Sequence, residues 1–217
     1  MYAFGGGFDY SFHGVISERK TNGKKGNPAR QIVSDEELMS AAGKGDLGAF
    51  EQIVLRHQVT VWNTAYRFLG DRAEAEDAAQ DVFLKLLEAA GHYRATASFR
   101  TYLYRVVTHL CLDRVRKKKP IYTDTPPDVL DDSLSAPEQL QRQQRDQAVR
   151  EALEKLGGQQ RMAIILKYYE NLSYREISAV MDVSEKAVER LLARGRASLE
   201  KILEKYFEPD IFCGGLG

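Results

Sequence analysis

The chain has 217 residues, of which 31 are basic and 31 are acidic, so its formal net charge at pH 7 is zero. Because the charges balance, the overall charge gives no reason to expect nucleic-acid binding. Such a reason would require a local excess of charge of one sign. The longest apolar stretch, MAIIL, is far too short to cross a bilayer, and Cys111 and Cys213 lack metal-ligand spacing. We therefore expect a cytoplasmic protein without membrane insertion, cofactor, metal site or catalytic residues.

The first 31 residues differ from the rest of the chain. They are rich in glycine and polar residues, with scattered aromatic side chains and no helical or strand periodicity. This composition predicts a disordered extension over residues 1–31. Whether the extension belongs to the functional unit is left open by the sequence.

Four amphipathic helices are predicted between residues 34 and 117, each starting at a residue that can cap free backbone N–H groups. These four residues are Ser34, Asp46, Asp71 and Ser98. Glu37 lies three residues after Ser34 and completes a capping box. Apolar residues then recur every three or four positions, which indicates one buried face per helix. The side chains expected on these faces include Ile53, Phe68, Val82, Phe83, Leu87, Leu103 and Val107.

Residues 120–147 break the helical pattern. Between residues 120 and 146 there are six acidic residues and two arginines, and four prolines interrupt regular structure. We therefore predict an acidic flexible linker between two small helical domains. Ser135 and Glu138 form a second capping box, at which helical structure is expected to resume.

The second domain is also predicted to be helical. Its first helix is expected to end at Gly157 and Gly158. The inner face of the next helix is expected to hold Met162, Ile165, Leu166 and Tyr169. Because no segment shows strand periodicity, the predicted fold class is all-α, with two small helical domains.

Residues 173–199 show the pattern of a helix-turn-helix motif. Ser173 and Glu176 form a third capping box that opens a short helix. In the three-residue turn that follows, Asp182 tolerates the left-handed backbone conformation better than most residues. Ser184 caps a longer helix, whose outer face is either a DNA-reading surface or a solvated charged face. The candidate DNA-binding residues on it are Ser184, Lys186, Glu189, Arg190, Arg194 and Arg196.

A local excess of positive charge lies in HLCLDRVRKKK, residues 109–119, where Asp113 is the only acid. Tyr102, Arg105 and His109 recur every three or four positions, so an aromatic ring shares a helix face with basic residues. Such a face suits unstacked single-stranded bases and their phosphates. The alternatives are a solvated helix end and a tyrosine that packs at the domain edge. The candidate residues are Tyr102, Arg105, His109, Arg114, Arg116, Lys117, Lys118 and Lys119.

Four ordered motifs resemble those of bacterial RNA polymerase sigma factors of the extracytoplasmic-function (ECF) type. They are SDEELMSAAGKGDLGAFEQIVLRH, AEDAAQDVFLKLLEA, FRTYLYRVVTHLCLDRVRKKKP and QQRMAIILKYYENLSYREISAVMDVSEKAVERLLARGRASL. The resemblance implies a sigma region 2 bundle over residues 32–119, a linker over 120–147 and a region 4 helix-turn-helix domain over 148–206. Residues 207–217 would then form a tail.

The same resemblance implies what each surface binds. A sigma factor is a non-catalytic subunit that binds core RNA polymerase, recognises promoters in duplex and melted form, and is often held by an anti-sigma factor. The basic face near residue 109, with the loop over residues 91–98, would read the minus-ten element, and the outer face of the last helix the minus-thirty-five element. The residues expected to bind core polymerase are Asp77, Gln80, Asp81, Phe83 and Leu84.

Exposed carboxylates beside an apolar patch are a reasonable partner surface on physical grounds as well. A solvated acidic face is one alternative. A di-metal carboxylate site is another, but the chain has no Glu-x-x-His pair to support it. The acidic motif AEDAAQDVF is therefore best interpreted as a docking surface.

The chain departs from the family pattern at several positions. Tyr102 stands where relatives often carry tryptophan, and His109 replaces a common asparagine, which puts its base contact in doubt. Glu189 lies where a basic residue is frequent in relatives, so the minus-thirty-five sequence that relatives recognise does not transfer to this chain. Gly157 and Gly158 replace the Pro-Glu pair that usually precedes the first core helix of region 4 in the family.

Two other functions compete with that of a sigma factor. A helix-turn-helix regulator that acts without polymerase would explain the C-terminal domain but leave the acidic motif and the Tyr102 face without a role. A helical enzyme would need a nucleophile–base motif, whereas the four histidines are scattered.

Overall fold

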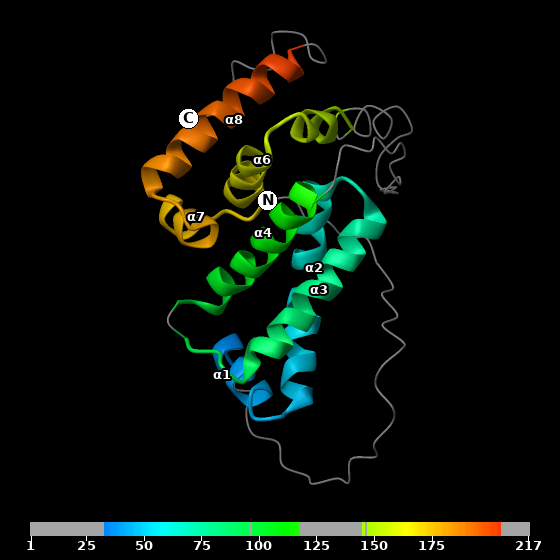
Figure 1. Ribbon diagram of the computed structural model, residues 1–217, viewed down its shortest axis with the longest axis vertical. Coiled ribbons are helices and arrows are strands. Elements are labelled where there is room, and N and C mark those ends of the chain that lie inside the picture. The colour runs from blue at the N-terminus through cyan, green and yellow to red at the C-terminus, as the bar shows by residue number, and fades with distance from the viewer. Residues whose placement is uncertain (1–32, 96, 118–144, 146, 205–217) are drawn as a thin grey trace.

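The computed structural model describes residues 33–95, 97–117, 145 and 147–204, and the regular structure within them is helical (Figure 1). The first half contains α1 (Asp35–Ala42), α2 (Leu47–Leu69), α3 (Arg72–Ala90) and α4 (Phe99–Lys117). The second half contains a helix over residues 147–154, then α6 (Gly158–Ile164), the π-helix η1 (Ile165–Tyr169), α7 (Tyr174–Met181) and α8 (Glu185–Leu203). The N-terminal extension, the C-terminal tail and the Ser135 capping box lie outside the described residues.

The predicted helix starts in the first half are confirmed. Ser34 Oγ accepts the Glu37 N–H at 3.2 Å and the Glu37 carboxylate accepts the Ser34 N–H at 2.9 Å, which is the capping box. Asp46 and Asp71 cap α2 and α3 through their carboxylates. Each of these hydrogen bonds satisfies an N–H group that the first turn of a helix leaves without a partner.

The N-terminus of α4 is capped from two directions. Ser98 Oγ accepts the Thr101 N–H at 3.2 Å, as the sequence predicts. Glu36 Oε1, from α1, accepts the Phe99 N–H at 2.7 Å. Because α1 and α4 are far apart in the chain, the second cap fixes where α4 begins relative to the rest of the bundle.

Helices α2, α3 and α4 pack against one another, and α1 contacts α2 and α3. Their buried faces include Ile53, Phe68, Val82, Leu103 and Val107. The prediction that Leu87 lies on a buried face is wrong, because this side chain is 37% exposed. The buried stripe of α3 instead runs through Ala75, Ala79, Val82, Leu86 and Ala90, so the position after Leu86 is turned about 100° away.

The helix-turn-helix motif also forms as predicted. Ser173 and Glu176 make the capping box at the start of α7, and Ser184 Oγ accepts the Ala187 N–H at 3.2 Å at the start of α8. Asp182 ends α7 in the left-handed conformation, with φ 56° and ψ 48°. This conformation turns the chain sharply enough for α8 to follow α7 after a short turn.

The helix over residues 158–169 departs from the expectation at its end. Its last turn is a π-helix, in which the Glu170 N–H reaches back five residues to the Ile165 carbonyl, at 3.2 Å. A π turn accommodates an extra residue and rotates the side chains that follow it. Tyr169 is therefore 40% exposed instead of buried, and Glu170 takes the inward position with 8% exposure.

Gly195 brings α8 close to α6. It is buried in the middle of α8, and a Cβ atom at this position would lie 3.0 Å from Cγ1 of Ile164. Since that distance is tighter than ordinary van der Waals contact, a side chain here would require Ile164 to give by a few tenths of an ångström.

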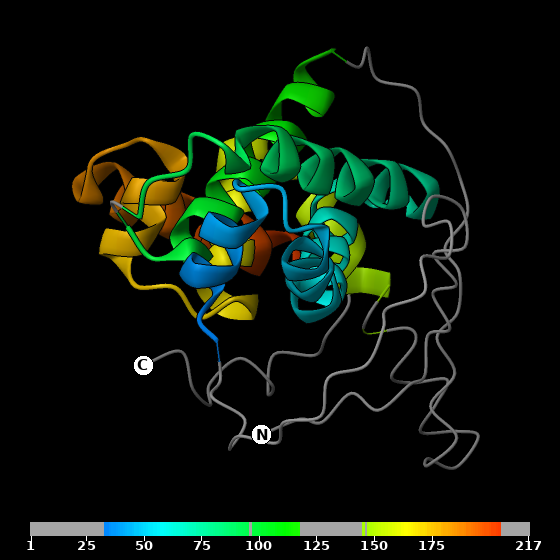
Figure 2. The ribbon, with the colours of Figure 1, turned by 90° about the horizontal axis from the view of Figure 1, so that it is seen from below.

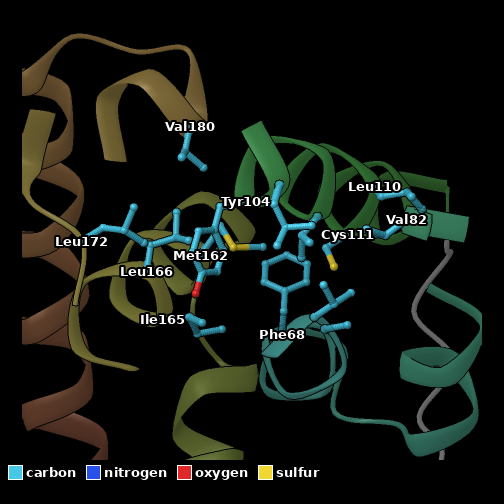
Figure 3. Packing of buried hydrophobic residues seen from close by; sticks show 14 of the residues in the cluster. Phe68, Val82, Tyr104, Leu110, Cys111, Met162, Ile165, Leu166, Leu172 and Val180 are labelled. Carbon is cyan, nitrogen blue, oxygen red and sulfur yellow. The ribbon is translucent and has the colours of Figure 1, made fainter. Parts of the chain in front are cut away.

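The two halves of the chain share one continuous core. Figures 1 and 2 place α4 between the α2–α3 pair and α7. In Figure 3, Phe68 of α2 and Tyr104 of α4 lie beside Met162 and Ile165 of the second half. These side chains are at most 3% exposed. The sequence predicts the helices of both halves but not this contact between them.

Cys111 of α4 is buried, and burial raises the pKa of its thiol to about 12, although Arg114 acts in the opposite direction. Very little of the thiol is then ionised at pH 8.5, and the thiolate is the reactive form. In a Cys213→Ser variant, we expect iodoacetamide to modify the folded protein very slowly at pH 8.5 and the urea-unfolded protein rapidly. Equal rates by mass spectrometry would contradict the burial.

Candidate nucleic-acid interface

The outer face of α8 carries the first candidate DNA-binding surface. All six residues predicted for it are exposed: Ser184, Lys186, Glu189, Arg190, Arg194 and Arg196. Lys186, Arg190 and Arg194 follow one another at intervals of four, so their cationic groups lie along one side of the helix. The buried face of α8, which includes Val188 and Leu192, fixes the direction of this charged side. The structure thus leaves the predicted reading face accessible.

Tyr102, on α4, belongs to a small aromatic cluster. Its ring centroid lies 5.3 Å from that of Tyr93, which in turn lies 6.3 Å from Phe99. The pKa values of the Tyr93 and Tyr102 hydroxyls are raised, mainly by burial. One side of the Tyr102 ring therefore packs within the protein. Because the residue is half-buried, part of it remains exposed to solvent.

The basic residues at the end of α4 differ in how accessible they are. His109, Arg116 and Lys117 are exposed, although Arg116 lies 3.6 Å from Asp113. Arg114 is half-buried and forms an ion pair with Asp81 of α3. Arg114 is therefore partly neutralised before any DNA binds. Lys118 and Lys119 lie outside the described residues.

The acidic motif of α3 contains three exposed side chains on one face, Asp77, Gln80 and Leu84. Their intervals of three and four place them side by side on the helix surface. The two other predicted docking residues are less available. Asp81 holds Arg114, and Phe83 is partly buried against the core. The sequence offered no signal for the Asp81–Arg114 pair, which depends on how α3 packs against α4.

Comparison with known proteins places both halves of the chain in one family. A family model for Sigma-70 region 2 matches residues 53–121, and a model for Sigma-70 region 4 matches residues 146–199. The ECF RNA polymerase sigma factor SigW of Bacillus subtilis is 31% identical over 171 residues, which cover 74% of this chain and 91% of SigW. The chain belongs to the ECF sigma factor family.

Further relatives agree with this assignment. The ECF RNA polymerase sigma factor SigM of Mycobacterium tuberculosis strain H37Rv is 31% identical over 174 residues, covering 80% of this sigma factor and 87% of SigM. Among solved structures, CnrH in complex with the cytosolic domain of CnrY matches with a TM-score of 0.60 and 28% identity. That match covers 79% of this chain and 97% of the solved one.

A buried polar cluster joins region 2 to region 4 of this sigma factor. Oε1 of Glu170 lies 3.0 Å from Thr64 Oγ1, whose single proton is shared with the Thr60 carbonyl at 2.8 Å, and it accepts a hydrogen bond from Arg67 Nη1 at 3.5 Å. Oε2 of Glu170 accepts one from Tyr104 Oη at 2.5 Å. Burial, together with the hydrogen bond and the charge of Glu170, raises the pKa of Tyr104. A buried carboxylate with three donors is well compensated for its loss of water.

Further contacts between the two regions surround this cluster. Arg100 of region 2 donates to the Glu170 carbonyl, and Arg161 of region 4 donates to the Phe68 carbonyl at 2.7 Å. Burial lowers the pKa of Arg161. At the edge of the contact, Arg105 lies 3.7 Å from Asp182 in the helix-turn-helix turn. One of the residues predicted to bind minus-ten DNA thus faces a carboxylate of region 4.

The described part of this sigma factor shows neither a metal site nor a membrane span. No group of three His, Cys, Asp or Glu residues within it is arranged to hold a metal ion. None of its helices is both long and apolar enough to cross a bilayer.

Proposed function

We propose that this chain directs core RNA polymerase to promoters by reading two DNA elements with two separate surfaces, one on α4 and one on α8. As an ECF sigma factor it is an initiation factor of RNA polymerase and not an enzyme. The observation that carries the proposal is the presence of two basic helix faces, one in each sigma region. A regulator that acts without polymerase would need only the face on α8.

In this proposal α8 enters the major groove of the minus-thirty-five element. Side chains near the start of a recognition helix reach base edges, and those further along reach phosphates. Ser184, Lys186 and Glu189 would therefore face the bases. Arg190, Arg194 and Arg196 would anchor the helix to the backbone and to nearby base edges.

Region 2 would hold the minus-ten element. The cations that end α4, from Arg114 to Lys119, would bind phosphates, while Tyr102 and the loop over residues 91–98 would receive an unstacked base. Arg105 and His109 lie between these two groups on the same helix. Since Arg114 already pairs with Asp81, DNA must compete with this carboxylate for it.

The proposed polymerase-binding surface is the exposed face of α3 with Asp77, Gln80 and Leu84. Asp77→Lys is expected to weaken binding to core polymerase by roughly tenfold or more, because reversing a charge opposes a complementary partner surface. Helicity should not change, since Asp77 is exposed. Phe83→Ala is a poorer test, because Phe83 is partly buried and its loss also destabilises the fold.

The measurement is a binding titration of labelled sigma factor with purified core enzyme. Glu51→Lys, the same charge reversal at an exposed position of α2, is the matched control and should bind like wild type. If folded Asp77→Lys protein binds core polymerase with unchanged affinity, α3 is not the docking surface.

We further infer an anti-sigma partner and a location in the cytoplasm, where RNA polymerase acts. One structural neighbour, CnrH, was solved in complex with the cytosolic domain of CnrY. Another neighbour, 19% identical with a TM-score of 0.58, is the sigma factor RpoE of Bartonella quintana in complex with the anti-sigma factor NepR. A partner of this kind would control when the sigma factor reaches polymerase.

A further inference from the structure

Helix α1 lies against both ends of the connection between α3 and α4, and Figures 1 and 2 both place it beside this connection. At the far end, Glu36 Oε1 accepts the N–H of Phe99, the first residue of α4, at 2.7 Å. At the near end, Gly43, the residue that ends α1, lies against the backbone of Ala90 and Gly91. The family model for region 2 matches residues 53–121, so α1 precedes the matched segment.

The Glu36 hydrogen bond sets where α4 begins, since the helix already has a local cap. Ser98 Oγ accepts an N–H group of the first turn at 3.2 Å. The neighbour of Glu36 acts on the same end of α4: Asp35 holds His57 at 2.7 Å, and the His57 ring lies 5.3 Å from the Phe99 ring. α1 therefore holds the first residue of α4 by its backbone and, through His57, by its ring.

The close approach of Gly43 acts on the backbone that carries Tyr93. A Cβ atom on Gly43 would overlap the carbonyl oxygen of Ala90 and lie 2.8 Å from its carbonyl carbon. The same carbonyl accepts the Tyr93 N–H at 3.2 Å. Because φ of Gly43 is −64°, a value that any residue adopts, it is the lack of space that requires a glycine here. The position of Tyr93 therefore depends on how closely α1 approaches α3.

The Tyr93 ring is held by packing. Its hydroxyl is buried and has no hydrogen-bond partner within the described part of the chain. The ring lies 6.3 Å from that of Phe99 and 5.3 Å from that of Tyr102. Burial raises the pKa of Tyr93, and the charge of Glu36 raises it further. The places of the three rings thus follow from the two backbone segments that α1 holds.

We propose that α1 determines which bases the minus-ten surface selects, with Glu36 and Gly43 as positioning residues for Tyr93 and Tyr102. This inference rests on the proposed function of Tyr102 and the loop before α4. Base contacts specify a sequence, whereas phosphate contacts provide position and affinity. The phosphate-binding cations lie at the opposite end of α4, which ends at Lys117. A change in α1 therefore alters the choice of base and leaves the phosphate contacts in place.

The test uses variants of the full-length protein bound to core polymerase. Glu36→Ala removes the acceptor for the Phe99 N–H, Glu36→Gln keeps an acceptor oxygen, and Gly43→Ala places a methyl group against Ala90. Each complex binds a pool of single-stranded oligonucleotides with randomised bases, and the bound fraction is sequenced. The affinity for one enriched oligonucleotide is measured at several salt concentrations. Hydrogen exchange of the Phe99 amide is followed by NMR in the free sigma factor.

Two controls separate positioning from loss of charge and from loss of stability. Glu51→Ala removes a carboxylate at an exposed position of α2. Val61→Ala weakens the buried core of the same bundle. Lost stability lowers the binding of all sequences in the same proportion, so both controls should select the same bases as wild type.

In Glu36→Ala, the preference for the most enriched base over the others is expected to fall by roughly fivefold or more, the lower end of what one correct base contributes to specificity. The Phe99 amide should exchange faster, and the slope of log affinity against log salt should stay that of wild type. Glu36→Gln should restore both the base preference and the slow exchange. Gly43→Ala should change the base preference with the same unchanged slope.

Three results would overturn the proposal. The first is an unchanged base preference in both Glu36→Ala and Gly43→Ala while Tyr102→Ala changes it. The second is an equal loss of preference in Val61→Ala, which would reduce the effect to stability. The third is equally fast exchange of the Phe99 amide in wild type and Glu36→Ala. If Tyr102→Ala also left the preference unchanged, the proposed function of the minus-ten surface would fail and this inference with it, while the exchange rates would still decide whether Glu36 holds α4.

Discussion

Replacing both Arg190 and Arg194 of α8 with alanine is expected to reduce transcription from promoters that depend on the minus-thirty-five element by roughly two orders of magnitude. A good side-chain contact to a base edge contributes about 1–3 kcal/mol, and arginine contacts to phosphate add further affinity. Both residues are exposed on the outer face of α8 and away from its buried stripe. Their removal should therefore leave the fold and core binding unchanged.

Run-off transcription with purified core enzyme measures this loss, and a parallel core-binding titration separates DNA reading from docking. Lys44→Ala combined with Lys201→Ala is the control, since it removes two positive charges at exposed positions outside the proposed reading face. Equal activity of the Arg190/Arg194 variant on all such promoters would show that α8 is not the reader.

Replacing Lys117, Lys118 and Lys119 with alanine should weaken promoter binding about equally for all sequences. Interactions with phosphates provide affinity and position but carry no sequence information. Each lysine–phosphate interaction that is removed should reduce the steepness of log affinity against log salt by roughly 0.7 for single-stranded DNA or 0.9 for duplex DNA. The expected effect of removing all three is therefore large at low salt and small at high salt.

The measurement is the affinity of the polymerase complex for promoter DNA at several salt concentrations. Tyr102→Ala provides the contrast, because it should change which sequences open while leaving the salt dependence nearly the same. An unchanged slope for the triple lysine variant would mean that the basic run is solvated surface and does not bind phosphates.

The helices could be predicted well because capping and amphipathic spacing are local rules. Ser34, Asp46, Asp71 and Ser184 start their helices as expected, since the hydrogen bonds involved span only a few residues. The exposure of the α8 candidates followed from the same spacing. Where local spacing changes, prediction fails: the π turn that ends at Tyr169 shifts the register by one residue.

The remaining features depend on packing between distant segments. Asp81 and Arg114 looked like members of two different binding surfaces, and their ion pair forms because α3 packs against α4. Glu170 gave no signal at all, since a glutamate near the end of a helix is ordinarily solvated. Its role becomes visible once Thr64 and Tyr104, from two other helices, are seen to donate to it.

The close approach of α8 to α6 at Gly195 limits how new promoter specificities can be engineered. A recognition helix transplanted from a relative with a side chain at this position would require Ile164 to give by a few tenths of an ångström. Where Ile164 does not move, α8 has to shift instead, and the arginines on its outer face move with it. Hybrid sigma factors should therefore exchange α6 and α8 as one unit, with the glycine and its isoleucine neighbour inherited from the same parent.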